Sequence, residues 1–426
     1  MPGPRLRRTA AIFGVLRNRE LRALWFADWI SDVGNFITSI ALVVYIFNLT
    51  GRATAVGLAL ALGSIPWFTV GPFAGLLADR VDRRSLMITA NLIRAVLVGA
   101  LPFTREVWQA YALSLASFML APVHRPARSA FLADIAPEGK LVPALAVMET
   151  THQVLHTVGP AIGGLAVLTL GARHAFFLDS ASFVIAAAFQ ATIASRGVPT
   201  VESAGSAVQD LWEGVRAVFA AGATRTYILL NSVLGLGFAG VEALLVVYVR
   251  DELGRPSGQY GIVLAVAGLG TVLTSLAIAA ADEHRPRTPW VLASAAGVGT
   301  FAVAFLHPSF LALLPVALAA GLADAGVGIP MTATLAESLP ERLRGRAYAA
   351  VDTMWELTAA IGFLGFAWLG EAGRLGAANG MGVAAVVGSA LGAAVLLGGG
   401  ARAIAGSERA RLAPKPAGGS PAGLSG

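Results

Sequence analysis

The chain has 426 residues, of which 56% are hydrophobic and only 13% are charged. A soluble domain usually carries about 25% charged residues, so this composition excludes an ordinary soluble enzyme and predicts a membrane protein. The chain contains no cysteine, which also excludes disulfide bonds and thiolate chemistry.

Twelve segments of the chain are long and apolar enough to cross a bilayer, because one span needs about 20 apolar residues. The segments are 22–48, 54–78, 85–104, 107–131, 141–170, 174–194, 226–249, 259–281, 288–306, 310–338, 345–370 and 376–399. We therefore expect an all-α membrane protein with twelve transmembrane helices. The first run is too long for the core of a signal peptide and lacks a clear cleavage site, so we expect it to remain as the first helix.

The net charge of +6 is distributed in a way that predicts orientation. With the N-terminus in the cytoplasm, 24 of the 31 Lys and Arg residues fall on cytoplasmic segments, six fall on the opposite side, and Arg94 lies inside the membrane. Cytoplasmic segments of membrane proteins carry such an excess of basic residues. We therefore expect both termini in the cytoplasm and do not expect a nucleic-acid partner.

Four polar residues lie on one face of the first segment: Asp28, Asp32, Asn35 and Ser39 are spaced by four, three and four residues. A charge at the centre of a spanning helix costs about 2.5–3.5 kcal/mol, so this face must meet the protein interior or water. Two carboxylates one turn apart repel each other when both are ionised, which suits a proton carrier. The alternative is a pair of structural carboxylates bonded to Arg94 or to another helix.

A short basic stretch, Gly75-Leu-Leu-Ala-Asp-Arg-Val-Asp-Arg-Arg84, joins the second and third segments and must lie at a membrane surface. Glycine lets two helix backbones approach closely, and the charges form a compact cluster that can pair with itself or with neighbouring helices. The pattern G-x-x-x-D-R-x-x-R-R resembles the loop signature of the major facilitator superfamily of secondary transporters. The resemblance implies two six-helix bundles and a cytoplasmic gate motif that comprises Gly75, Asp79, Arg80, Arg83, Arg84 and Asp134.

This resemblance also implies a role for the charges of the motif. It assigns Asp79, Arg83 and Asp134 to a network that holds the inner side shut while the protein is open to the outside. Asp134 stands at the end of the fourth segment, where that partner is expected. The arginine motif of the superfamily in the middle of the fourth helix is not recognisable, so no arginine is assigned its coupling role.

The fifth segment carries a second polar face, formed by Glu149, His152 and His156 at positions i, i+3 and i+7. Imidazoles titrate near neutral pH, so together with a carboxylate they can pass protons. Structural hydrogen bonding is an equal alternative. No metal site is expected, because nothing else clusters with these residues.

The same segment continues into Gly159-Pro-Ala-Ile-Gly163-Gly164. Proline removes a hydrogen-bond donor and bends a helix, and Gly159 with Gly163 makes a packing face of small residues. The run resembles the Gly-Pro motif that exporters of the superfamily place in their fifth helix, which assigns Gly159, Pro160, Gly163 and Gly164 to that motif. A simple packing kink is the alternative.

Residues 195–225 connect the two sets of segments. The first part is a linker that contains Gly, Ser and Pro, and apolar residues then recur at helical spacing from Val208 to Phe219. This pattern predicts a short amphipathic helix on the cytoplasmic surface, and a simple tether fits as well. The chain after Gly400 is rich in Ala, Gly, Pro and Ser and is expected to be disordered. The expected domains are 1–194, the linker 195–225, 226–400 and the tail 401–426.

In the second set of segments, Asp324 is the most isolated deep carboxylate, and Gly321, Gly326 and Gly328 around it allow the helix to flex. Further candidates for a cavity or proton site are Glu242, Asp352 and Glu356. Each ionisable residue inside a membrane calls for a functional or pairing explanation.

The chain repeats itself at a shift of 203 residues. Under this shift Val43-Val44-Tyr45 falls on Val246-Val247-Tyr248, Gly51-Arg52 falls on Gly254-Arg255, and Leu132-Ala133-Asp134 falls on Leu335-Ala336-Glu337. One constant offset in separate regions predicts two six-helix pseudo-repeats in parallel orientation. The second copy has lost two members of the gate motif, because Gly75 falls on Ile278 and Arg83 falls on Pro286.

Three runs look like the bacterial branch that includes enterobactin exporters and macrolide-efflux permeases: 126–134, 158–164 and 177–183. This resemblance implies a secondary transporter in the bacterial cytoplasmic (inner) membrane. It would export a small amphipathic molecule, such as a drug, a siderophore or another secondary metabolite, by proton antiport with alternating access. We expect a monomer without cofactors, whose partners are the substrate, protons and the lipid bilayer.

Two other functions stay open. An importer or a lysophospholipid flippase on the same fold is the first, because a fold does not determine direction or substrate. A membrane-embedded sensor or enzyme is the second and is less favoured, because the sequence shows no metal-ligand cluster, nucleophile motif or phosphate-binding loop. We therefore do not expect an enzyme.

Overall fold

The computed structural model describes residues 14–71, 81–195, 207–220, 222–256, 258–280, 286–371 and 373–412. Within these ranges the chain forms helices joined by short turns and contains no strand, so the expected all-α architecture is confirmed. Eight described segments are long and apolar enough to cross a membrane: Arg19–Thr50, Arg83–Phe103, Ala172–Ala191, Gly222–Glu252, Gln259–Ile278, Thr288–Leu306, Phe310–Ser338 and Ala377–Arg409.

The helical elements follow the order of the predicted segments. In the first half they are η1 (Gly14–Arg17), α2 (Arg19–Thr50), α3 (Ala53–Thr69), α5 (Arg83–Ala100), η2 (Leu101–Phe103), α6 (Val107–Phe118), α7 (Ala121–Ile135), α8 (Leu141–Leu170) and α9 (Ala172–Ala191). In the second half they are α10 (Ala207–Ala220), α11 (Gly222–Val247), η3 (Tyr248–Glu252), α12 (Gln259–Ala280), α13 (Thr288–Gly299), η4 (Thr300–Leu306), α14 (Phe310–Ser338), α15 (Glu341–Leu369), α16 (Ala377–Val395), η5 (Leu396–Gly400) and α17 (Ala401–Leu412).

Each predicted segment contains at least one helix. Prolines explain some of the places where the helix boundaries differ from those of the predicted segments. The fourth segment is divided into α6 and α7, because Pro122 in the first turn of α7 has no backbone N–H to continue the hydrogen bonds of α6. By contrast, α8 continues without interruption through Pro160. The second segment is described as far as Gly71.

The expectation of a disordered tail after Gly400 is wrong for Ala401–Leu412, which form α17. The composition favoured disorder, but Ile404 and Glu408 of this helix are buried. Burial of one face stabilises a short helix that its sequence alone would not hold. Residues 413–426 lie outside the described part of the chain.

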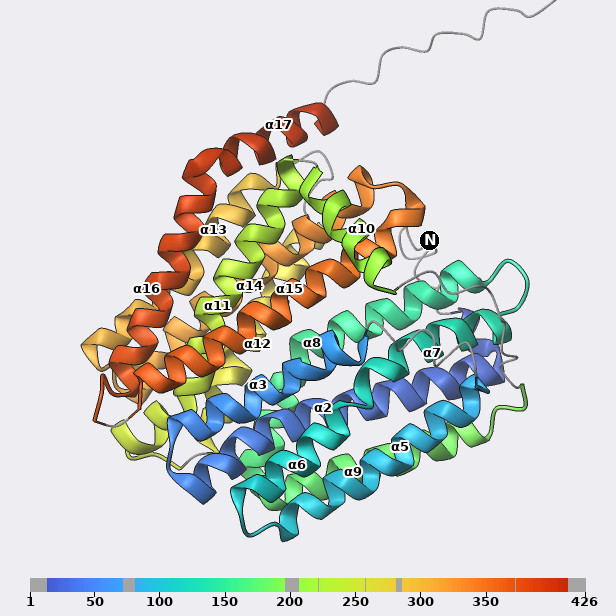
Figure 1. The fold of residues 1–426 in the computed structure, drawn as a ribbon, viewed down its shortest axis with the longest axis horizontal. Coiled ribbons are helices and arrows are strands. Elements are labelled where there is room, and N and C mark those ends of the chain that lie inside the picture. The colour runs from blue at the N-terminus through green and yellow to red at the C-terminus, as the bar shows by residue number, and fades with distance from the viewer. Residues whose placement is uncertain are drawn as a thin grey trace, which may run out of the picture.

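The helices form two bundles that lie side by side (Figure 1). In the first bundle, α2 packs against α8 and α9, and α5 packs against α7 and α9. In the second bundle, α11 packs against α15 and α16, and α12 packs against α14. The connecting helix α10 lies on the second bundle, against α15 and α11.

The two bundles repeat the same local contacts at the shift of 203 residues. The hydroxyl of Tyr45 donates to a backbone carbonyl just beyond η2 at 2.9 Å, and the hydroxyl of Tyr248 donates to one just beyond η4 at 2.6 Å. Gly51 and Gly254 both have a φ of 62°, in the left-handed region that glycine adopts without strain. The internal repeat of the sequence is therefore also a repeat of structure.

In the part of the chain that the structure describes, the bundles share a core at one end only. We call this the outer end; it carries the turns 51–52 and 253–256. The largest hydrophobic cluster lies there and combines residues of α2, such as Phe47, with residues of α11, such as Leu244. At the opposite, inner end, which carries the turns 136–140 and 339–340, the core is divided into one cluster for each bundle. The bundles thus meet at the outer end and diverge toward the inner end (Figure 1).

Two helix crossings hold the outer end together. Helix α8 crosses α12 where Gly164 faces Gly261, and a Cβ on either glycine would fall against the backbone of the other. Helix α3 crosses α15 where Gly57 lies against Phe363 and Ala367. Small residues at these points let the helix backbones approach closely, which is the main source of attraction between helices in lipid.

A carboxylate adds a polar contact to the second crossing. Glu371 of the second bundle accepts a hydrogen bond from the backbone N–H of Thr54 at 2.8 Å, and it lies 3.6 Å from Arg52. Thr54 is in the first turn of α3, where backbone N–H groups have no partner inside the helix. One bundle therefore caps a helix of the other, and Arg250 donates to Asn48 across the same end.

We predict that a disulfide can bridge the bundles at the outer end. A Cβ on Gly258 would lie 3.0 Å from the Cα of Leu168, so Gly258→Cys combined with Leu168→Cys brings two Cβ atoms as close as a disulfide requires. The chain has no native cysteine. After cleavage at a protease site introduced into residues 196–206, the two halves should stay together on a denaturing gel until reductant is added.

The matched control is Gly258→Cys with Val154→Cys. Val154 lies on the same helix as Leu168 but about 21 Å along the axis toward the inner end, so this pair should give no bridge. Equal cross-linking of both pairs would contradict the arrangement of the outer end.

Candidate functional site

The polar face of α2 meets basic side chains from three other helices of the first bundle. Asp28 contacts Arg128 of α7, Asp32 contacts His152 of α8, and Asn35 contacts Arg94 of α5. The spacing of four and three residues places these side chains on one face. The structure therefore turns the predicted polar face toward the interior of the bundle. The hydroxyl of Ser39, at the end of this face, donates to a carbonyl of α2 itself.

Asp28 is buried and holds α2 to α7. Its Oδ2 accepts a hydrogen bond from Nη1 of Arg128 at 3.2 Å, and Nε2 of His124 lies 4.0 Å from its Oδ1. That Oδ1 has no hydrogen-bond partner among the described residues. A carboxylate removed from water needs a cation beside it, and Arg128, whose side chain is 12% exposed, supplies it. The surroundings of Asp28 fit the structural alternative.

Asp32 is more accessible than Asp28. Its Oδ2 lies 3.1 Å from Nδ1 of His152, and the two side chains are 23% and 26% exposed. Next to this pair, Nε1 of Trp25 donates to the hydroxyl of Thr151 at 2.9 Å, which holds α2 and α8 in register. Because a carboxylate and an imidazole can each hold a proton, the pair of Asp32 and His152 has the chemistry of an exchangeable proton site.

Arg94, the charge inside the membrane, bonds to an amide. Its Nη2 donates to Oδ1 of Asn35 at 2.6 Å, and its guanidinium lies 4.2 Å from the ring centre of Phe183. A planar guanidinium can donate hydrogen bonds and stack on an aromatic ring at the same time. Arg94 therefore bonds to Asn35, and the alternative in which it bonds directly to Asp28 and Asp32 is wrong.

The second polar face is only partly described. Glu149 is exposed on α8, one turn before His152. The backbone of His156 continues α8, but its side chain lies outside the described part of the structure. Among the described residues, no group of three or more His, Cys, Asp or Glu could hold a metal ion.

The Gly-Pro motif joins α8 to a helix on each side. Gly159 and Gly163 face α2, and Gly164 faces Gly261 of α12 in the other bundle. Pro160 stays inside the continuous helix. A larger side chain at Gly163 or Gly164 would meet the backbone of the neighbouring helix, and one at Gly159 would meet the ring of Phe36. The motif therefore lies at the joint where the bundles meet, and it packs that joint.

Three of the predicted proton-site candidates in the second bundle form no ion pair with a basic side chain in the described part of the chain. Asp324 is exposed on α14 and accepts a hydrogen bond from Thr271 of α12 at 3.4 Å. Glu356 of α15 lies near Ser64 on α3 of the other bundle. Glu242 of α11 lies close enough to Glu356 for their charges to repel.

A fourth carboxylate of the second bundle makes a contact between the bundles. Asp352 of α15 lies 3.3 Å from Nη1 of Arg125 on α7, and both side chains are about half exposed. The contact lies well inside both helices, away from the turns at the inner end. Toward that end the bundles diverge (Figure 1).

The gate motif is described in part. Nη1 of Arg83 donates to Oδ2 of Asp134 at 2.8 Å, which ties the start of α5 to the end of α7. Arg84 donates to two carbonyls at the end of α9, where the helix dipole favours a cation. Gly75, Asp79 and Arg80 lie outside the described residues. The Arg83–Asp134 pair lies within one bundle and exists while the bundles diverge, so this pair alone does not hold them together.

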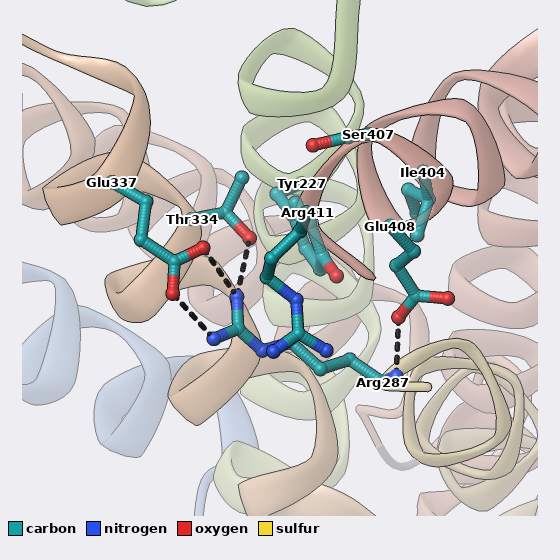
Figure 2. Close-up of a pocket in the computed structure, with 8 residues that line it drawn as sticks. All are labelled: Tyr227, Arg287, Thr334, Glu337, Ile404, Ser407, Glu408 and Arg411. Atoms are coloured by element: carbon teal, nitrogen blue, oxygen red, sulfur yellow. Dashed lines mark hydrogen bonds and ion pairs between the residues drawn. The ribbon is translucent and has the colours of Figure 1, made fainter. Parts of the chain in front are cut away.

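The second bundle has an equivalent ion pair, but its arginine stands one position later in the chain than Arg83 does in the first repeat. Arg287 makes a two-point contact with Glu337, with distances of 2.7 and 3.1 Å (Figure 2). Glu337 stands where the first repeat has Asp134. Pro286 stands where the first repeat has Arg83 and carries no charge, so the next residue along the chain supplies the guanidinium.

Sequence reasoning assigned no partner to the basic residues of α7. His124 and Arg128 are one turn apart and both lie beside Asp28, while Arg125 points to the other bundle. A signal was present, because basic residues within an apolar segment require acidic partners. The sequence does not say which of several carboxylates each one meets.

Comparison with known proteins gives consistent matches. The family model described as Major Facilitator Superfamily matches residues 24–363 and 227–421. The chain is 25% identical over 374 residues to the uncharacterized MFS-type transporter YfiS of Bacillus subtilis strain 168, covering 84% of this chain and 88% of that protein. It is 26% identical over 366 residues to the multidrug efflux pump Tap of Mycolicibacterium fortuitum, covering 81% and 87%.

In structure, the chain is similar to a crystal structure of a mutant of the nucleoside transporter NupG. The TM-score is 0.72 at 12% sequence identity, and the match covers 91% of this chain and 99% of that chain. At so low an identity the likeness supports the fold and not the substrate.

We predict that loss of Arg128 destabilises the first bundle more than loss of its partner. Arg128→Gln leaves the buried Asp28 carboxylate without its guanidinium, which costs about 3–5 kcal/mol in buried pairs. Asp28→Asn should cost less, because Asp32 and Glu149 still act on Arg128. The double variant should resemble Asp28→Asn. The measurement is the midpoint of thermal unfolding in detergent, followed by tryptophan fluorescence.

Asp32→Asn is the matched control on the same face of α2. The partly exposed side chain of Asp32 can exchange one hydrogen bond for a bond to water. The midpoint of thermal unfolding should therefore fall less than in Arg128→Gln or Asp28→Asn. Equal losses for Arg128→Gln and Asp32→Asn would contradict the assignment of Asp28 as the buried charge.

Proposed function

The chain belongs to the major facilitator superfamily, and from this premise we propose that it exports a small amphipathic molecule in exchange for protons. It is a multi-pass membrane transporter and not an enzyme. The observation that carries the proposal is the pair of Asp32 and His152, a partly exposed carboxylate and imidazole 3.1 Å apart on α2 and α8. A carboxylate and an imidazole in contact can each bind and release a proton.

The proposed cycle places the inner end in the cytoplasm of a bacterial cell, because most Lys and Arg residues lie on segments at that end. The bundles then diverge toward the cytoplasm and meet toward the outside. Rocking of the two bundles about the middle would open the outer end and close the inner end. The divided core at the inner end supports this, because little apolar surface resists separation there.

The proton enters the cycle at Asp32. Protonation neutralises the carboxylate of Asp32 and raises the net charge of the pair with His152 by one, which weakens the electrostatic hold on a cationic group of the substrate. A proton that moves inward across the whole membrane releases about 2.3 kcal/mol per 100 mV. That free energy is the source from which uphill export is driven.

Side chains around the pair favour an amphipathic substrate. Trp25 and Trp29 stack with ring centres 6.3 Å apart, and Trp29 is exposed. Glu149 and Asp324 are exposed on helices of opposite bundles. A carboxylate in the middle of a spanning helix is costly against lipid, so we place both toward the space between the bundles. The multidrug efflux pump Tap supports the assignment to drug export.

The direction of transport separates this proposal from its alternative. An importer or a lysophospholipid flippase would use the same helices with a different direction or substrate. Proton-driven uptake into everted membrane vesicles supports export. Uptake only into right-side-out vesicles would favour the importer.

We predict that Asp32→Asn abolishes accumulation driven by a pH gradient, because an amide cannot carry the proton. The assay uses proteoliposomes with an imposed gradient and screens siderophores, macrolides and dyes. Glu149→Gln and Asp324→Asn should each reduce accumulation to a smaller extent. Glu213→Gln is the control, because this carboxylate pairs with Arg346 at the surface, away from the proposed path.

If all three variants of the proton sites accumulate substrate as the wild type does, the assignment of those sites is wrong. A loss of accumulation in Glu213→Gln equal to that in Asp32→Asn would also contradict it.

A further inference from the structure

The second bundle lacks the acidic residue that begins the third helix of the first bundle. Asp82 caps α5: its Oδ2 accepts a hydrogen bond from the N–H of Ser85 at 3.0 Å and another from the Ser85 hydroxyl. The first N–H groups of a helix have no partner inside it, and a carboxylate there also meets the positive end of the helix dipole. At the shift of 203 residues, Asp82 falls on Arg285, which has no acceptor.

Helix α13 is capped from the C-terminal helix instead. Oε1 of Glu408 accepts hydrogen bonds from the backbone N–H of Arg287 and from that of Thr288 at 2.9 Å, and Oε2 accepts one from the Thr288 hydroxyl at 2.6 Å. The side chain of Arg287, the N-cap residue, makes no cap hydrogen bond. Glu408 is 8% exposed. Helix α17 therefore supplies the carboxylate that the second repeat has lost.

Arg287 joins three helices at this point. Figure 2 shows its guanidinium between Glu337 and Thr334 of α14, while its backbone N–H reaches Glu408 of α17. Tyr227 of α11 and Ile404 of α17 line the same pocket. Because Glu408 of α17 is bonded to the backbone N–H of Arg287, a shift of α17 also moves the residue that pairs with Glu337.

We propose that Glu408 is a positioning residue of the inner gate, and that docking of α17 sets how readily the inner ends of the bundles close on each other. The inference rests on the proposed function only in that the bundles rock between two states. Closure brings the inner end of α14 toward the first bundle. A helix end that is already ordered closes at a lower entropic cost than a loose one, so loss of Glu408 shifts the population toward the state with an open inner end.

The test measures the gate directly and needs no substrate. Because the chain has no cysteine, spin labels on Ala133→Cys of α7 and Ser338→Cys of α14 report the separation of the inner ends in proteoliposomes by double electron–electron resonance. Glu408→Gln should lower the ratio of short-distance to long-distance populations about fivefold, the effect of losing one helix cap. Arg409→Gln, an exposed neighbour on α17, should leave the ratio unchanged.

A second variant keeps the test decisive if Glu408→Gln does not fold. Thr288→Val removes only the hydroxyl donor, so it should shift the ratio in the same direction by a smaller factor. The double variant of Glu408→Gln and Thr288→Val should shift the ratio no further than Glu408→Gln alone, because both changes remove the same contact. The ratio does not depend on the amount of folded protein, so it separates gate positioning from general stability.

An unchanged ratio in Glu408→Gln and in Thr288→Val would overturn the inference, even if proton-driven transport is found. An equal shift in Arg409→Gln would overturn it too. A shift confined to the two contact variants supports it, even if the protein proves to be an importer.

Discussion

The crossing of α8 over α12 at Gly164 and Gly261 is the contact on which the rest of the structure depends. In lipid, two apolar helices gain little from hiding apolar surface from each other, so attraction comes from close packing. The two glycines allow the backbones to touch, and the shared core extends this contact at the outer end. Among the described residues the inner end has two separate cores instead, so separation there costs little, and the outer joint must loosen when the outer end opens.

The carboxylates of the two bundles have different neighbours. In the first, Asp28 and Asp32 each lie against a basic side chain, which limits the cost of burying a carboxylate. In the second, Glu242, Glu356 and Asp324 have hydroxyl or carboxylate neighbours instead. Such groups need water, a proton or a bound ligand to offset the loss of hydration.

Local spacing was enough to predict the polar face of α2, because residues three and four apart must share a face of any helix. It was not enough to separate the roles of Asp28 and Asp32, which differ only in what α7 and α8 place beside them. The repeat likewise predicted an acidic partner at Glu337. It could not predict that Arg287 would replace the lost arginine or that Glu408 would arrive from a helix expected to be disordered.

The sequence by itself determined the membrane class, the order of the helices and their duplication. These depend on hydrophobicity, periodicity and a constant offset, which are properties of short stretches of chain. Tertiary structure alone decided which charges meet, which end is closed and where the C-terminal helix lies. Those outcomes depend on distances between residues far apart in the chain, and several carboxylates were equally available to each arginine until packing brought one of them within reach.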